Sequence, residues 1–239
     1  MKVTLLIPTL NEESGCKVIL PKINKNWVDE ILVIDGQSSD NTVKVCQENG
    51  IKVIIQKEKG LNASFREAWP HITGDVVITF SPDGNSIVDE IPTLINKMKE
   101  GYDMVIVSRY LNNAKSDDDT LVTAFGNWLF TKSINLFHRS NYTDAMVMFR
   151  AYKSKIFYDL ELDNYDKSYK FYEKIFFTKI GVEPLLSIRA AKAKLKIGEI
   201  PGDEPPRIGG KAKLQVIRWG LAYYSQVIYE FFFNKIKKK

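Results

Sequence analysis

The stretch VTLLIPTLNE, residues 3–12, decides the fold: an apolar run stops at a proline and opens onto a polar loop. The same plan recurs in ILVIDGQSSDNT, residues 31–42, and in DVVITFSPDGN, residues 75–85. Each run has the length and the β-branched residues of a buried strand, and each gives way to acidic or small polar residues. Because ligands of an open α/β sheet bind at the carboxyl ends of its strands, the sequence predicts a polar ligand site where these strands end.

Strand and helix patterns alternate along the first half of the chain, which is typical of a doubly wound, mostly parallel sheet. Strands are expected at residues 2–8, 30–35, 51–56, 75–80 and 103–107. Helices are expected between and after them, at residues 12–24, 40–49, 61–71 and 87–100. The predicted fold class is α/β, with a Rossmann-like half over residues 1–110.

The pattern changes after residue 110, where a polar loop contains three successive aspartates. Helices are expected at residues 120–138, 153–160, 167–181 and 183–193, and strands at residues 142–151 and 194–200. These elements form the second half, residues 111–214, of one domain that covers residues 1–214. A separate basic, aromatic, amphipathic helix is expected over residues 215–239.

Composition fits an ordinary globular protein: 239 residues suit one large domain, and 44% hydrophobic residues are ample for a core. Cys16 and Cys46 are too few for a disulfide framework. The net charge of +5 is concentrated in residues 211–239, which hold seven basic residues and one glutamate. This distribution favours an anionic surface or ligand over nucleic-acid binding. With a strand expected from residue 2 and no apolar run of spanning length, we expect no signal peptide, no membrane span and a cytoplasmic location.

A series of motifs, in order, resembles the family 2 glycosyltransferases of the GT-A fold. That family has Pro-Thr/Ala-x-Asn-Glu after its first strand, then Asp-Asp/Gly-x-Ser-x-Asp-x-Thr, then Asp-x-Asp, and the corresponding residues here are Pro8–Glu12, Asp35–Thr42 and Ser81–Asp83. Downstream, similar motifs stand at Val107–Tyr110, Thr143–Arg150 and Glu183–Pro201. Arg207–Leu214 resembles the Arg-x-x-Gly-x-Ser-Lys loop of the dolichol-phosphate mannose synthase branch.

The resemblance implies a nucleotide-sugar donor, either a UDP-sugar or a GDP-sugar. Uracil and guanine carry N–H groups, so Asp35 at the end of the second strand is expected to accept hydrogen bonds from the base or the ribose. Further donor-binding residues are expected around the same crevice: Pro8, Thr9, Glu12, Ser38, Gly60 and Asn62.

The donor's diphosphate needs positive charge, and the resemblance implies Mg²⁺ or Mn²⁺ at the Asp-x-Asp position. Ser81 replaces the first aspartate, so Asp83 is expected to hold the metal, with Ser81 or Asn85 assisting directly or through water. One carboxylate instead of two predicts weaker metal affinity, and an ordinary Pro-Asp-Gly turn is the alternative interpretation. Basic side chains expected to stabilise phosphates are Arg109, Arg207, Lys211 and Lys213.

An inverting transfer to a hydroxyl needs a general base near the acceptor, and Asp144 is the first candidate, ahead of Glu183 and Asp166. A phosphate acceptor is already ionised and needs no base, so Asp144 would then orient neighbouring groups. The polyprenol-phosphate branch has a further arginine that residues 121–125 lack. The acceptor therefore stays open between a glycan and a polyprenyl phosphate.

The aromatic residues of the tail, flanked by lysines, suit either peripheral contact with a membrane or packing on the domain or on a second subunit. The resemblance implies an inverting, metal-dependent glycosyltransferase of cell-envelope or polysaccharide biosynthesis. One alternative is a non-catalytic nucleotide-sugar-binding protein, which the serine at position 81 suggests. The other is a nucleotidyltransferase, but that class needs a glycine-rich basic loop where this chain has Pro8–Glu12.

Overall fold

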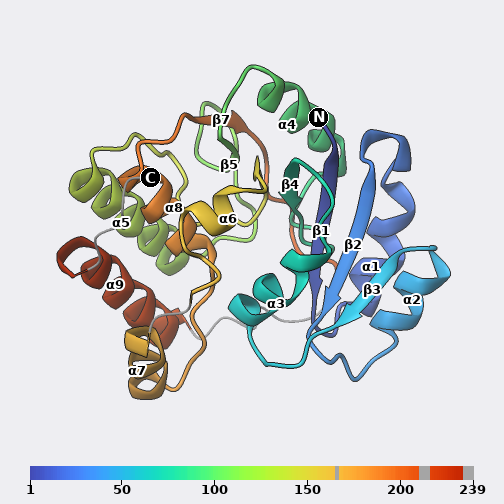
Figure 1. Cartoon of the computed structure of the whole chain (residues 1–239), viewed down its shortest axis with the longest axis horizontal. Coiled ribbons are helices and arrows are strands. Elements are labelled where there is room, and N and C mark those ends of the chain that lie inside the picture. The colour runs from blue at the N-terminus through green and yellow to red at the C-terminus, as the bar shows by residue number, and fades with distance from the viewer. Residues whose placement is uncertain (165–166, 210–215, 234–239) are drawn as a thin grey trace.

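The structure is a computed structural model that describes residues 1–164, 167–209 and 216–233. Its centre is a seven-stranded sheet in the order β3-β2-β1-β4-β6-β5-β7 (Figure 1). β6 runs antiparallel to β4 and β5, and the other neighbours are parallel. The strands are β1 (Val3–Thr9), β2 (Glu30–Asp35), β3 (Lys52–Ile55), β4 (Val76–Thr79), β5 (Met104–Ser108), β6 (Arg150–Lys153) and β7 (Ile197–Pro201).

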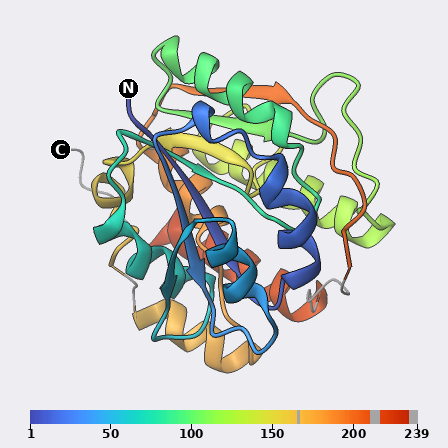
Figure 2. The ribbon, with the colours of Figure 1, turned by 90° about the vertical axis from the view of Figure 1, so that its right-hand side faces the viewer.

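Helices cover both faces of this sheet, which confirms the α/β prediction. In the described ranges they are α1 (Glu13–Ile19), α2 (Thr42–Glu48), α3 (Leu61–Ala68), α4 (Ile91–Lys99), α5 (Leu121–His138), α6 (Ile156–Asp159), α7 (Lys167–Phe176), α8 (Glu183–Lys192) and α9 (Val216–Phe232). Figure 2 shows α1 and α2 in front of the sheet, where they form a core layer with α4. The core layer on the opposite face is built with α3 and with α5 to α9.

Successive side chains of the buried strands point to opposite faces of the sheet and so contribute to both core layers. Leu6 and Leu32 pack toward α3 and the second-half helices, whereas Leu5, Ile7 and Val33 pack toward α1 and α2. All five side chains are fully buried, as expected for parallel strands that helices cover on both sides. This double burial fixes the strand register and with it the positions of the strand ends.

Several helices are shorter in the structure than the sequence predicts, two of them where a proline follows. The helix expected at 12–24 ends at Ile19, where a 3-10 turn containing Pro21 follows. Likewise, the helix expected at 61–71 gives way to a 3-10 turn that contains Pro70. The helix expected at 167–181 ends at Phe176, because Phe177 adopts a left-handed φ of 49°.

The strand expected at 142–151 is wrong: the strand in this region is β6, and residues 142–149 form a loop. Backbone N–H groups of this loop donate to side chains and not to a neighbouring strand. Glu199 on β7 accepts the backbone N–H groups of Thr143 at 2.9 Å and Asp144 at 3.3 Å. The N–H of Ala145 donates to Thr131 Oγ1 at 3.1 Å, so the amides of residues 143–145 are bound by side chains and not by a strand ladder.

Candidate functional site

The ends of β1 and β2 bring the expected base-binding residues together. Pro8 pairs with Ile34 and Thr9 with Asp35 in the parallel register. Thr9 Oγ1 donates to Asp35 Oδ1 at 2.8 Å, while Ser38 donates its Oγ to Oδ1 at 2.6 Å and its N–H to Oδ2 at 2.8 Å. A carboxylate offers about four lone-pair sites, so these bonds leave room for one more donor. Asp35 has no exposed surface, and a base would reach it only after the surrounding loop shifts.

Glu12 lies in the loop between β1 and α1, at the same edge of the sheet. Its backbone N–H donates to Thr42 Oγ1 at 2.8 Å, which ties this loop to the start of α2. Glu12 lines a small cavity of about 70 Å³ together with Asp40, Asp83 and Arg207. The structure thus connects the expected nucleotide crevice with the expected metal and phosphate residues.

Asp83 follows β4 and is covered by the loop that carries Arg207. Arg207 Nη1 lies 2.9 Å from Asp83 Oδ2, and the N–H of Ile208 donates to the backbone oxygen of Asp83 at 2.7 Å. Gly84 has a φ of 93°, and a Cβ there would lie 2.7 Å from Ile208 Cγ1. Only glycine therefore allows both this turn and this close approach of the two loops.

Asp118, from the loop between β5 and α5, is a site residue that the sequence reasoning missed. Its Oδ2 accepts Asn85 Nδ2 at 3.0 Å and Arg207 Nε at 3.0 Å. The available signal was the run of three aspartates at residues 117–119, which in sequence looks like a solvated loop. Burial works against the charge of Arg207, but Asp83, Asp118 and Glu12 together raise its pKa.

These residues fit a hard divalent cation. Carboxylate and amide oxygens are the ligands that Mg²⁺ and Mn²⁺ accept. Asn85 Oδ1 is buried and has no hydrogen-bond partner among the described residues, so an oxygen is left over for a ligand. No three His, Cys, Asp or Glu side chains in the described ranges form a complete metal cluster, so donor phosphates would have to supply further ligands.

Arg109 and Asp144 also come together, but they bind each other. Arg109 Nε and Nη2 lie 2.6 and 3.1 Å from the two carboxylate oxygens of Asp144, and Arg109 Nη1 lies 3.1 Å from Glu204. Asp144 has no exposed surface and also accepts the N–H of Met146 at 3.2 Å. Burial alone would raise the pKa of Asp144, but the charge and hydrogen bonds of Arg109 hold it below its usual value. In this arrangement Asp144 binds the guanidinium of Arg109 through both carboxylate oxygens.

Glu183, the first residue of α8, lies in the interior beneath the loop that precedes this helix. Burial raises the pKa of its carboxyl group, and the charge of Arg150 partly opposes that effect. Arg150 is itself buried, and its Nη1 donates to Ser187 Oγ at 2.8 Å. The structure therefore places Glu183 next to an internal arginine that the sequence reasoning did not assign to the site.

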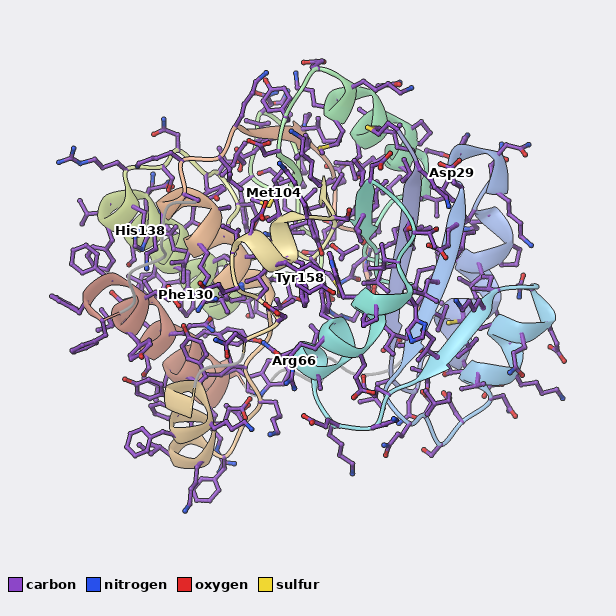
Figure 3. All side chains as sticks on the ribbon, viewed as in Figure 1. Asp29, Arg66, Met104, Phe130, His138 and Tyr158 are labelled. Atoms are coloured by element: carbon purple, nitrogen blue, oxygen red, sulfur yellow. The ribbon has the colours of Figure 1, made fainter. Side chains whose placement is uncertain are left out.

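Gly60 and Asn62 line a larger cavity of about 650 Å³ between α3, the α7 region and the start of α9. Both amide atoms of Asn62 and the hydroxyl of Thr178 are buried without a hydrogen-bond partner in the described part of the chain. Figure 3 labels Arg66 on the side of α3 that faces this cavity. Other basic residues of the lining are Lys59, Lys170, Lys174 and Lys179, against the acids Glu58 and Glu173. The cavity thus combines unpaired polar groups with a positive charge balance.

The tail helix α9 packs on α5, α7 and α8 by one face. Glu230 is fully buried there, 2.9 Å from Arg189 Nη2 and 3.0 Å from Lys192 Nζ. The opposite face leaves the large apolar side chains of Leu221 and Phe232 exposed, and Phe233, just after the helix, is exposed as well. None of the helices in the described ranges combines the length and the apolar character that crossing a bilayer requires.

Three of the expected residues cannot be placed. Lys211 and Lys213, expected to bind phosphate, lie outside the described residues, and so does Asp166, the weaker candidate base.

Comparison with known proteins shows the family. The sequence model described as "Glycosyl transferase family 2" matches residues 4–161. The chain is 26% identical over 220 residues to "Glycosyltransferase AglJ" of Haloferax volcanii, covering 91% of this chain and 68% of that protein. It is 34% identical over 128 residues to a dolichol-phosphate mannosyltransferase of Pyrococcus furiosus, covering 49% of this chain and 36% of that protein. The match to an undecaprenyl-phosphate 4-deoxy-4-formamido-L-arabinose transferase of Klebsiella pneumoniae, at 26% identity, covers 70% of this chain and 53% of that protein.

Solved structures agree on the fold. A crystal structure of glucosyl-3-phosphoglycerate synthase from Mycobacterium tuberculosis with phosphoglyceric acid superimposes with a TM-score of 0.67 at 14% identity, covering 98% of this chain and 81% of that one. The same enzyme with Mn²⁺ and uridine-diphosphate-glucose gives a TM-score of 0.61 at 16% identity, covering 95% and 76% of the two chains. At this identity the likeness shows the GT-A fold alone.

Proposed function

Because the chain belongs to glycosyl transferase family 2 and is a glycosyltransferase, we propose that it moves the sugar of a UDP- or GDP-sugar to the phosphate of a polyprenyl-phosphate acceptor, with inversion. This proposal rests mainly on one ion pair: Arg207 Nη1 lies 2.9 Å from Asp83 Oδ2, just after the end of β4. A carboxylate suited to a cation and a guanidinium suited to a phosphate lie together where a nucleoside diphosphate would bind.

The donor would bind with its base toward Asp35 and its diphosphate toward Asp83 and Arg207. A divalent cation bound at Asp83 and Asn85 would stabilise the negative charge of the leaving nucleoside diphosphate. The acceptor oxygen attacks the anomeric carbon and forms a new C–O bond, while the bond to the diphosphate breaks and its electron pair leaves with that group. The guanidinium of Arg207 offers paired donors to the departing phosphate.

A phosphate acceptor fits the state of Asp144. Both oxygens of Asp144 are engaged by Arg109, so neither is placed to take a proton from an acceptor. A phosphate oxygen is already ionised and needs no such base. Asp144 would instead hold Arg109 in place.

The larger cavity would bind this acceptor phosphate. Asn62 and Thr178 present buried polar groups without partners among the described residues, and Arg66 of α3 and two lysines of α7 line the same space. Exposed apolar side chains stand close by on α7 and the segment after it, with Phe171 60% and Phe177 80% exposed. A phosphate in the cavity and an isoprenoid chain against these side chains would match both kinds of surface.

We propose peripheral contact with a membrane along the same side of the molecule. α5, α7 and α9 lie together there (Figure 1), and each exposes large apolar residues, as Phe125, Phe171 and Phe232 do. A surface that holds aromatic side chains near basic residues suits the headgroup region of an anionic bilayer. The named relatives that act on dolichol phosphate and undecaprenyl phosphate support a lipid-linked acceptor and cell-envelope biosynthesis.

The test is a transfer assay with labelled UDP- and GDP-sugars, Mn²⁺ or Mg²⁺, and two acceptor classes: polyprenyl phosphates in detergent and soluble glycans. The expected result is label in the lipid phase that depends on Asp83. Asp83→Asn removes the transfer, whereas the exposed Asp89→Asn, a matched charge change, preserves it. Transfer to glycans alone would replace the lipid acceptor by the glycan alternative. Donor binding without transfer to any acceptor would favour a non-catalytic binding protein.

A further inference from the structure

Asp118 reaches the cation site from a different part of the chain than the Asp-x-Asp position. It lies between β5 and α5, more than thirty residues after Asp83, yet its Oδ2 bonds both Asn85 and Arg207 at 3.0 Å. Arg207 in turn joins Asp83 at 2.9 Å. The guanidinium therefore bridges two carboxylates that belong to separate loops.

Two carboxylates contact Arg207 among the described residues. Asp83 and Asp118 lie 2.9 and 3.0 Å from nitrogen atoms of its guanidinium. Like charges repel strongly at short range in a partly buried site, so these carboxylates would oppose the entry of a nucleoside diphosphate. A divalent cation bound to the two carboxylates would reduce that repulsion.

Asn85 gives independent evidence for a ligand at this place. Its amide is nine-tenths buried and is oriented by the bond from Nδ2 to Asp118, yet Oδ1 finds no partner among the described residues. A buried oxygen left without a partner is costly unless a ligand or water occupies the space beside it. An oxygen-preferring cation between Asp83 and Asp118 would satisfy it.

We propose that Asp118 supplies the second carboxylate of the cation site, in place of the acidic residue that position 81 lacks. Without the metal, the positive charge of Arg207 neutralises part of the charge of the two carboxylates. The divalent ion replaces Arg207 as their counter-charge when it binds. Arg207 is then free to bind the donor's phosphates. This assignment rests on the proposed metal-assisted function, because it concerns the same site.

The experiment measures Mn²⁺ binding directly, by electron paramagnetic resonance of free Mn²⁺, with and without UDP or GDP. Asp118→Asn should weaken Mn²⁺ binding by at least the 10- to 100-fold that loss of a supporting carboxylate near a metal causes. The control is Asp117→Asn, an equal charge change at the exposed neighbouring residue, which should leave the affinity within about twofold because exposed charges are screened. Arg207→Gln should tighten binding of Mn²⁺ alone, since the competing cation is gone.

A rescue variant distinguishes the loss of a metal ligand from a folding defect. Ser81→Asp placed in the Asp118→Asn chain should restore much of the Mn²⁺ affinity, which a misfolded protein would not show. If Mn²⁺ binds the wild type and Asp118→Asn matches Asp117→Asn, the role of Asp118 is overturned while the proposed function stands. If the wild type binds no Mn²⁺ even with nucleotide, the metal-assisted part of the proposed function is overturned together with this assignment.

Discussion

Replacing Glu230 by alanine should destabilise the protein strongly, because it removes the counter-charge of a buried arginine. Glu230 Oε1 lies 3.1 and 2.9 Å from Nε and Nη2 of Arg189, and its Oε2 lies 3.0 Å from Lys192 Nζ. Breaking a buried pair by removing one partner costs about 3–5 kcal/mol. Arg189 keeps bonds to the backbone oxygens of Leu160 and Glu161, so we expect about 3 kcal/mol, the lower end of that range.

Thermal unfolding followed by circular dichroism measures this loss. For a chain of this size, each kcal/mol shifts the midpoint Tm by about 2–4 °C, so Glu230→Ala should lower Tm by about 6–12 °C. The matched control is Glu100→Ala, which removes an exposed glutamate 2.8 Å from Lys97. Exposed pairs contribute little, so the control should shift Tm by no more than about 2 °C. Equal Tm values for the two variants would refute the claim that this ion pair anchors α9.

The same pair predicts a pH dependence. Burial acts to raise the pKa of Glu230, but Arg189 and Lys192 together hold it below its usual value. A carboxylate with a lowered pKa in the folded state stabilises the fold above the pKa of the unfolded chain, about 4.3, and this contribution is lost as pH falls through the folded pKa. The Tm difference between wild type and Glu230→Gln should therefore be full at pH 7 and shrink below about pH 4.

Further predictions concern the donor site, one titrating group and the tail. Asp35→Ala should weaken donor binding by about 1–3 kcal/mol in calorimetry, the range for a lost partner of a buried polar group, and unchanged affinity would remove Asp35 from the site. Asp83→Asn should abolish the difference in donor affinity between Mn²⁺ and EDTA; a difference that persists would contradict the cation's placement. Burial raises the pKa of Glu90 to about 7, so the folded chain holds this proton more tightly than the unfolded chain and stability falls as pH rises from about 4.5 to 7. Glu90→Gln should therefore melt higher than wild type at pH 8 and alike at pH 5. Changing Phe232 and Phe233, 65% and 70% exposed, to serine should reduce binding to anionic liposomes at low salt without lowering Tm, and undiminished binding would argue against this face.

The sequence predicted that Thr9, Asp35 and Ser38 lie together, because the ends of strands are encoded locally. Apolar runs fix where β1, β2 and β4 end, and the parallel register then sets Thr9 against Asp35. The grouping of Thr9, Asp35 and Ser38 therefore followed from patterns within about forty residues of one another. The fold class is confirmed for the same reason, since the strand-helix alternation was strongest in this half.

The sequence could not reveal what depends on contacts between distant segments. Residues 142–149 look extended in sequence, but Glu199 on β7 accepts the backbone N–H groups of Thr143 and Asp144, and no local pattern contains that acceptor. The bonds of Asp118 to Asn85 and Arg207 likewise join three separate loops. For α9, the sequence could not decide between packing and contact with a membrane, since its anchors Arg189 and Lys192 lie on α8.

The most direct test of the proposed transfer reaction measures both of its products, the nucleoside diphosphate and the glycosylated lipid. With a UDP- or GDP-sugar, Mn²⁺ and a polyprenyl phosphate, we expect one nucleoside diphosphate released for each sugar that appears on the lipid, with the anomeric configuration inverted. Asp83→Asn should abolish both products together. Donor that binds with its Mn²⁺ dependence intact, yet releases no nucleotide with any acceptor, would contradict the central claim and leave a nucleotide-sugar-binding protein in its place.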